Sequence, residues 1–177
     1  MAAVRPALVP IVLATLAAAP AAVAAADLPA RKPGLWEITM QVTNAPSQTM
    51  RHCIDEKTDA QLQRMGQGMG QQQCTRNTLV RDGDRWVGES ECKFGNTVAT
   101  SRSVFAGDFD KAYKGEIDVK YAPPMAGVSQ SKVTMLAKWA GACPAGWKPG
   151  DMEMPGGMGR VNINEMSMHG APKAPRK

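Results

Sequence analysis

The sequence predicts a mainly β protein, an antiparallel meander curled into a barrel or a strongly twisted sheet, with one short helix after the second strand and an irregular C-terminal tail. Apolar and polar residues alternate with period two through most of the chain after residue 26, which is typical of half-buried strands. Short connections between these runs favour antiparallel neighbours. Four cysteines follow an apolar leader, which indicates a domain that is cross-linked by disulfides. We expect the curled form, because an open sheet would leave two edges exposed.

Seven runs of alternating residues are expected to form strands. They are residues 36–42, 48–53, 74–81, 85–92, 97–105, 113–121 and 132–139. Ala122-Pro123-Pro124 should end the sixth. Between the second and third, Thr58 followed by Gln61 resembles a capping box, which predicts a short helix that ends at Gly66. Residues 66–73 are interpreted as a flexible polar connector.

The clearest hairpin is predicted around Gly83, with a three-residue turn. Pairing its arms about Gly83 places Val80 opposite Trp86 and Cys74 opposite Cys92. Opposed cross-strand cysteines lie within reach of a disulfide. Because Val80, Trp86 and both cysteines then share one face, that face should point inward.

The first pair leaves Cys53 and Cys143 for a second disulfide, which would join the end of an early strand to the end of the last. A metal site and a redox pair are the alternatives. The chain has no C-x-x-C, and its cysteine spacings do not suit zinc. Two structural disulfides are therefore the favoured interpretation.

Residues 1–26 have the pattern of a secretory signal peptide. Arg5 supplies the early positive charge, and residues 7–19 form an apolar segment that is too short to span a bilayer. Small residues at Ala24 and Ala26 predict cleavage before Asp27. The leader would engage the secretion machinery and bring the mature chain to an oxidising compartment. No later stretch is apolar enough to span a membrane.

The mature chain is expected to form one β domain over residues 27–143. Residues 144–177 are rich in Met, Gly and Pro, and we expect this tail to pack on the domain and to fray after about His169. The net charge is +5 for the whole chain and +4 without the leader, with basic residues spread out. This pattern indicates a solvated surface, with attraction to anionic envelope lipids as the alternative and nucleic acid not expected.

Signals of catalysis are absent from the sequence. After the leader the chain has two histidines and no G-x-S-x-G, H-E-x-x-H or Gly-rich phosphate loop. His52 adjoins Cys53, but an oxidised cysteine is not a nucleophile, so His52 is interpreted as an ordinary strand residue. We therefore expect no enzymatic activity, no catalytic residues and no cofactor.

Two functions remain open, and neither is catalytic. A curled antiparallel sheet can enclose a small apolar or envelope-derived ligand, although the same side chains could instead form a solid core. The side chains expected to line that interior are Trp36, Met40, Trp86, Ile117, Val119, Met135 and Trp139. The alternative is Cu(I) handling, because soft thioethers select that ion. The candidate ligands are Met152, Met154, Met158, Met166, Met168 and His169.

Several motifs match one family. They are the PGLWE run at residues 33–37, the Cys53-Ile54-Asp55 run before the helix, the cysteine hairpin, and the GACP run at residues 141–144. Together they resemble domain-of-unknown-function family 3617 (DUF3617), exported proteins of proteobacteria. The resemblance implies periplasmic residence and a shared β-rich domain. It implies no activity, so it transfers no catalytic residues. The KPGD and VNI runs of the tail are also similar to the family, which favours a structural role for the tail backbone.

Overall fold

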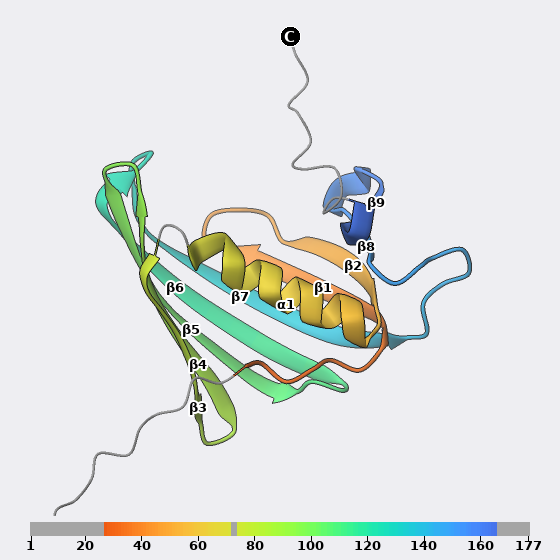
Figure 1. Cartoon of the computed structure of the whole chain (residues 1–177). Coiled ribbons are helices and arrows are strands. Elements are labelled where there is room, and N and C mark those ends of the chain that lie inside the picture. The colour runs from red at the N-terminus through yellow and green to blue at the C-terminus, as the bar shows by residue number, and fades with distance from the viewer. Residues whose placement is uncertain (1–26, 72–73, 166–177) are drawn as a thin grey trace, which may run out of the picture.

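The structure is a computed structural model that describes residues 27–71 and 74–165. One antiparallel sheet of nine strands carries a single long helix, α1, across one face (Figure 1). The elements are β1 (Gly34–Val42), β2 (Gln48–Ile54), α1 (Glu56–Gln71), β3 (Cys74–Asp82), β4 (Arg85–Phe94), β5 (Thr97–Asp108), β6 (Ala112–Met125), β7 (Val128–Gly141), β8 (Asp151–Glu153), η1 (Pro155–Gly157) and β9 (Arg160–Asn162). Their order across the sheet is β3-β4-β5-β6-β7-β1-β2-β8-β9.

The sheet is twisted and open. Strands β3 and β9 lie at its two edges, so the expected closure into a barrel is not confirmed. The helix that joins β2 to β3 lies over the inner face (Figure 1). An apolar helix face can cover a sheet as well as a second sheet wall does, so the fold does not need closure to bury its inner side chains.

Each of the seven expected strands is present, and β3 to β7 form a continuous meander. The sixth, β6, is longer than expected and continues through Pro123 and Pro124 to Met125. Its ladder with β7 shifts register between Lys120 and Met125. Proline has no amide hydrogen to donate, so the two prolines interrupt this ladder without ending the strand.

The tail is more regular than the sequence indicates. Strand β8 adds to the free edge of β2, where Arg51 faces Glu153 and His52 faces Met152, and β9 then pairs with β8. The turn before β8 is held by the Asp151 carboxylate, which accepts hydrogen bonds from the Lys148 amide at 2.8 Å and the Asn162 side chain at 2.7 Å. The expectation of an irregular tail is therefore wrong for residues 151–162.

The helix begins earlier and ends later than expected. Asp55, and not Thr58, caps it: the Thr58 amide donates to the Asp55 carboxylate at 2.8 Å, and the Thr58 hydroxyl accepts from the Asp55 amide at 2.8 Å. The helix then continues to Gln71, through most of the predicted connector. Glycine weakens a helix by about 1 kcal/mol per residue but does not forbid it, so Gly66 does not end this one.

The cysteine hairpin has a different register from the expected one. Its turn has two residues, Gly83 and Asp84, so that Arg81 faces Trp86 and Val80 faces Val87. An irregularity between Cys74 and Arg76 then restores Cys74 opposite Cys92. Because the pairing shifts by one residue, Val80 lies on the face opposite to Trp86, and the prediction that they share a face is wrong.

Both expected disulfides are present, Cys53–Cys143 and Cys74–Cys92. The buried core is made by Trp36, Ile38, Ile54, Phe109, Tyr113 and Ala137. Within it the Phe109 and Tyr113 rings stack with centroids 4.4 Å apart, and Trp36 contacts Tyr113 at 5.7 Å. No helix among the described residues is long and apolar enough to cross a membrane.

Candidate ligand-binding groove

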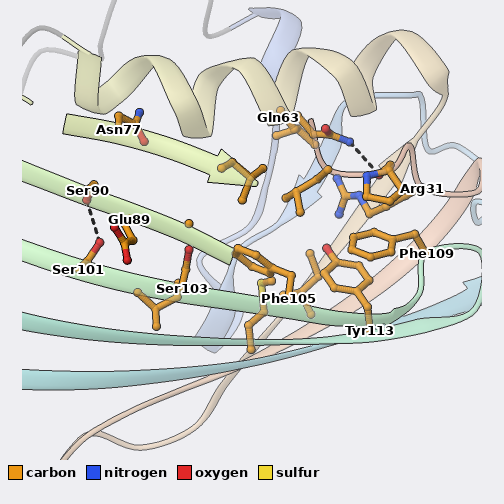
Figure 2. A pocket seen from close by; sticks show the side chains of 18 of the residues that line it. Arg31, Gln63, Asn77, Glu89, Ser90, Ser101, Ser103, Phe105, Phe109 and Tyr113 are labelled. Carbon is orange, nitrogen blue, oxygen red and sulfur yellow. Dashed lines mark hydrogen bonds between the residues drawn. The ribbon is translucent and has the colours of Figure 1, made fainter. Parts of the chain in front are cut away.

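A cavity of about 520 Å³ lies between α1 and the inner face of the sheet. We call it the groove. Figure 2 shows Ser90 and Ser101 at one end of it and Arg31 at the other, with the Phe105 and Tyr113 rings between them. The lining residues are Leu28, Pro29, Arg31, Ile38, His52, Leu62, Gln63, Asn77, Thr78, Leu79, Gly88, Glu89, Ser90, Ser101, Ser103, Phe105, Phe109, Tyr113, Ile117 and Met135. A largely apolar cavity of this size with a few polar groups is typical of small-molecule sites.

Small side chains keep the groove open. On the inner face of β4 and β5, Gly88 pairs with Ser103, and Ser90 pairs with Ser101. The Ser90 and Ser101 hydroxyls are 2.8 Å apart and share a hydrogen bond. A Cβ at Gly88 would lie 2.4 Å from the Ser103 Oγ, so any larger residue here would require the serine hydroxyl to move. These short residues leave space where larger ones would fill the gap beneath the helix.

A buried ion pair closes the opposite end. Arg31 donates to the Asp59 carboxylate twice, from Nε at 2.7 Å and from its main-chain amide at 2.8 Å. Gln63 also donates to this carboxylate at 3.1 Å. Arg31 is 8% exposed and Asp59 is 1% exposed, so the two charges neutralise each other away from water. Burial raises the pKa of the neighbouring Tyr113, whose hydroxyl is thus protonated at neutral pH.

His52 lines the same end of the groove from β2. It is 8% exposed, and neither ring nitrogen has a hydrogen-bond partner among the described residues. Burial, and secondly the positive charge of Arg31, lowers the pKa of His52 from 6.5 to about 4. The imidazole is therefore neutral at physiological pH and has both a donor and an acceptor to offer. The sequence analysis interprets His52 as an ordinary strand residue, and it does not predict that the side chain is buried at the groove.

The structure places the seven side chains predicted to line an interior in three different environments: the groove, the core and a second cavity. Ile117 and Met135 line the groove. Trp36 is fully buried in the core, and Met40, Trp86 and Trp139 pack against that core while partly buried. Val119 lines a second cavity of about 360 Å³, together with Thr43, Asp118, Lys120, Gln130, Ser131 and Lys132.

Sequence reasoning missed most of the lining. The segment before β1 contributes Leu28 and Pro29, and the helix contributes Leu62 and Gln63, although none of them belongs to an alternating run. The one available signal was the alternation of Ser101 and Ser103 along the fifth strand, which places polar residues on a face that apolar residues occupy elsewhere.

Of the methionines predicted to bind copper, Met152, Met154 and Met158 are described, and they lie in β8, which pairs with β2, or shortly after it. Met152 is in β8, directly opposite His52, and Met154 follows β8. Met158 is 71% exposed. Met166, Met168 and His169 lie outside the described residues. Within the described part of the chain, no cluster of three or more His, Cys, Asp or Glu side chains is arranged to hold a metal ion.

A family model described as "Protein of unknown function (DUF3617)" matches residues 31–143. No curated protein and no solved structure gives a match to the chain. The matched region contains β1 to β7, the helix, both disulfides and every lining residue of the groove except Leu28 and Pro29. The chain therefore belongs to the DUF3617 family.

Proposed function

We propose that this protein binds one small, elongated apolar molecule, such as an envelope-derived lipid fragment, in the groove. The observation that carries the proposal is the 520 Å³ cavity itself. It lies on the same sheet face as a tightly packed core, and small side chains of β4 and β5 line one end of it. Binding without chemistry fits the lining, because all four cysteines are in disulfides and the imidazole of His52 has no hydrogen-bond partner in the described chain.

The place of action in this proposal is the periplasm, reached after removal of residues 1–26. The two disulfides support an oxidising compartment, since such bonds seldom persist in a reducing cytosol. The mass of the protein recovered from its host tests this directly. A chain that begins at Asp27 is expected, and a full-length chain in the cytosolic fraction would contradict it.

The binding test uses N-phenyl-1-naphthylamine, an uncharged dye whose emission rises in apolar surroundings. Wild-type protein should bind the dye with a single saturable site. Ser103→Phe places a ring in the groove and should weaken binding about tenfold or more. Thr100→Phe adds the same ring to the exposed face of the same strand and should leave binding unchanged.

Two results would contradict the proposal. One is the absence of saturable dye binding to a folded wild-type protein. The other is an equal affinity in Ser103→Phe and in wild type, with both proteins showing the same thermal transition, because the dye would then bind elsewhere.

A second candidate function is Cu(I) binding, and the β2–β8 register favours it. Directly opposed residues of an antiparallel pair share a face, so Met152 offers a thioether beside the neutral imidazole of His52. Competition with the Cu(I) chelator bathocuproine disulfonate tests this idea. Met152→Leu should lose Cu(I) affinity, whereas Met125→Leu, at an exposed hairpin tip, should retain it. Equal affinities in the two variants would exclude this site.

A further inference from the structure

We propose that the free edge of β3 pairs with the β3 edge of a second copy of this chain, antiparallel and about a two-fold axis at Leu79, so that the protein is a dimer with one continuous sheet. The inference goes beyond the proposed function, because edge pairing requires no ligand in the groove. Three features of β3 support it: the length of the edge, the direction of its main-chain groups and the order of its charges.

Strand β3 is the longer of the two edges of the sheet. It has nine residues, whereas β9 at the other edge has three. Figure 1 shows β3 on the rim of the sheet, beside β4. Natural proteins usually protect such an edge with proline, lysine, a bulge or a very short strand. Residues 76–82 contain neither proline nor lysine and pair with β4 in unbroken register, so this edge is a ready template for another strand.

The main-chain groups of Leu79 and Arg81 point out of this edge. A two-residue turn joins Asp82 to Arg85, and the residues that flank such a turn bond to each other through their main chains. Hydrogen-bonded and non-hydrogen-bonded positions alternate along an antiparallel pair. Val80 therefore also bonds to β4, whereas Leu79 and Arg81 turn their amide and carbonyl groups away from it.

The next hairpin leads to the same assignment. A two-residue turn joins β4 to β5 between Phe94 and Thr97, so the even-numbered residues of β4 bond to β5. The odd-numbered residues of β4, Arg85 among them, are then the ones that bond to β3. Leu79 and Arg81 each offer one donor and one acceptor at the free edge, and a second strand can bond to all of these groups.

One register pairs this edge with itself and also matches its charges. With Leu79 opposite Leu79 of the second copy, Thr78 lies opposite Val80 and Arg76 lies opposite Asp82. Two-fold symmetry repeats the last contact, so the interface contains two Arg76–Asp82 pairs. A register shifted by two residues keeps the main-chain directions but places Arg76 opposite Val80, or Asp82 opposite Thr78. Both charge pairs are then lost.

These charges extend an alternating row that each chain already contains. In β4, Glu91 lies opposite Arg76, and Arg85 lies opposite Asp82. In the dimer the row continues from Arg76 across the edge to Asp82 and Arg85 of the second copy, so negative and positive side chains alternate over four strands. Opposite charges that face each other across strands stabilise a sheet. Arg76 and Asp82 also form ion pairs within one chain, but these are exposed and contribute little, so they do not prevent contact with a second copy.

The same register brings the two grooves together. Leu79 lies on the inner face of the sheet and lines the groove, and directly opposed residues of an antiparallel pair share a face. The two Leu79 side chains therefore meet at the axis, and the helices and grooves of both copies lie on one side of the joined sheet. Contact between these leucines adds apolar burial to the main-chain hydrogen bonds.

The experiment uses two charge-reversal variants and their mixture. Arg76→Asp places two aspartates opposite each other across the edge, and Asp82→Arg places two arginines there. Sedimentation equilibrium at low salt should show a dimer for wild type, and a dimer dissociation constant raised about tenfold or more for each variant alone. An equimolar mixture of the two should associate like wild type, because every aspartate then faces an arginine. The control Lys120→Glu reverses a charge on β6, three strands from this edge, and should leave the dissociation constant unchanged.

Three results would overturn the inference. They are a wild-type monomer at concentrations up to about 1 mM, a mixture that stays as dissociated as its two components, and an equal loss of association in Lys120→Glu. If a variant does not fold, hydrogen exchange of wild type decides. The Leu79 and Arg81 amides should exchange more slowly at high protein concentration than at low, and exchange that is independent of concentration would also overturn the inference. A monomer that still binds dye would contradict this inference and leave the proposed function intact.

Discussion

The inner face of the sheet has two halves that differ in side-chain size. One half of this face carries Trp36, Ile54 and Ala137, which pack into a core. Near the end of β4 and the start of β5 it carries Ser90 and Ser101, and the groove opens. Both halves belong to one continuous sheet beneath one helix (Figure 1). The backbone alone therefore creates neither the core nor the cavity; side-chain volume decides which forms.

Because of this difference in side-chain size, we expect different residues to determine the stability of the fold and its affinity for a ligand. A fully buried aromatic or aliphatic side chain contributes about 1.5–3 kcal/mol to folding, whereas a serine that faces a cavity contributes little. The packed half should therefore determine the free energy of unfolding, and the open half should determine affinity. We expect substitutions to fall into two corresponding groups.

The largest expected effect compares the two disulfides. Cys53–Cys143 closes a loop of 90 residues, and Cys74–Cys92 closes one of 18. On the loop-entropy model, removing the first by alanine at both cysteines should cost about 4.6 kcal/mol, and removing the second about 3 kcal/mol. Urea unfolding of the two double variants measures both values. A larger loss for the second pair would contradict the expectation that the longer loop contributes more.

The next effect concerns the buried ion pair. Asp59→Ala leaves the Arg31 guanidinium buried without its partner, which should cost about 3–5 kcal/mol. Glu56→Ala removes an exposed carboxylate from the same first turn and should cost less than about 1 kcal/mol. Thermal unfolding of both variants makes the comparison, and equal losses would show that the ion pair is not important for the fold.

A pH effect of similar size is expected from His52. Its pKa is about 4 in the folded state and 6.5 without burial, so between these values the unfolded chain binds a proton that the folded chain does not. Stability is therefore fully present above pH 6.5 and should fall by about 3 kcal/mol as the pH decreases to 4. Unfolding free energies of wild type and His52→Gln across this range test the sign. Parallel curves for the two proteins would exclude His52 as the source.

The smallest effect compares one methyl group in each half. Ile54→Val, in the packed half, should cost about 1 kcal/mol, because Ile54 is 2% exposed. Ile117→Val, in the groove, should cost less than half of that but should weaken binding of N-phenyl-1-naphthylamine. Similar losses of stability at both positions, with dye affinity unchanged, would remove the distinction between the halves.

Much of the fold could be predicted because its signals are local. Period-two alternation and tight turns located all seven long strands, and hairpin geometry located the Cys74–Cys92 pair. The three-residue strands β8 and β9 could not be predicted, since they form only where β2 offers a free edge. The predicted hairpin register is wrong by one residue. The cysteine pair was still predicted correctly, because an irregularity beside Cys74 brings it opposite Cys92.

The site was less predictable, because a cavity is defined by what is missing. Alternation identifies large apolar residues, and these are the ones that fill the core, as Trp36 does. The groove depends instead on short residues such as Gly88 and Ser103, and on the Arg31–Asp59 contact between segments 28 residues apart. No periodic pattern encodes such a long-range contact.

The most direct test of the central claim is native mass spectrometry of the protein purified from its own host without added ligand. We predict an organic adduct in wild type that is released on unfolding, is retained in Thr100→Phe and is absent from Ser103→Phe. A bare mass for folded wild type, or an adduct that persists in Ser103→Phe, would contradict the assignment of the groove as a binding site.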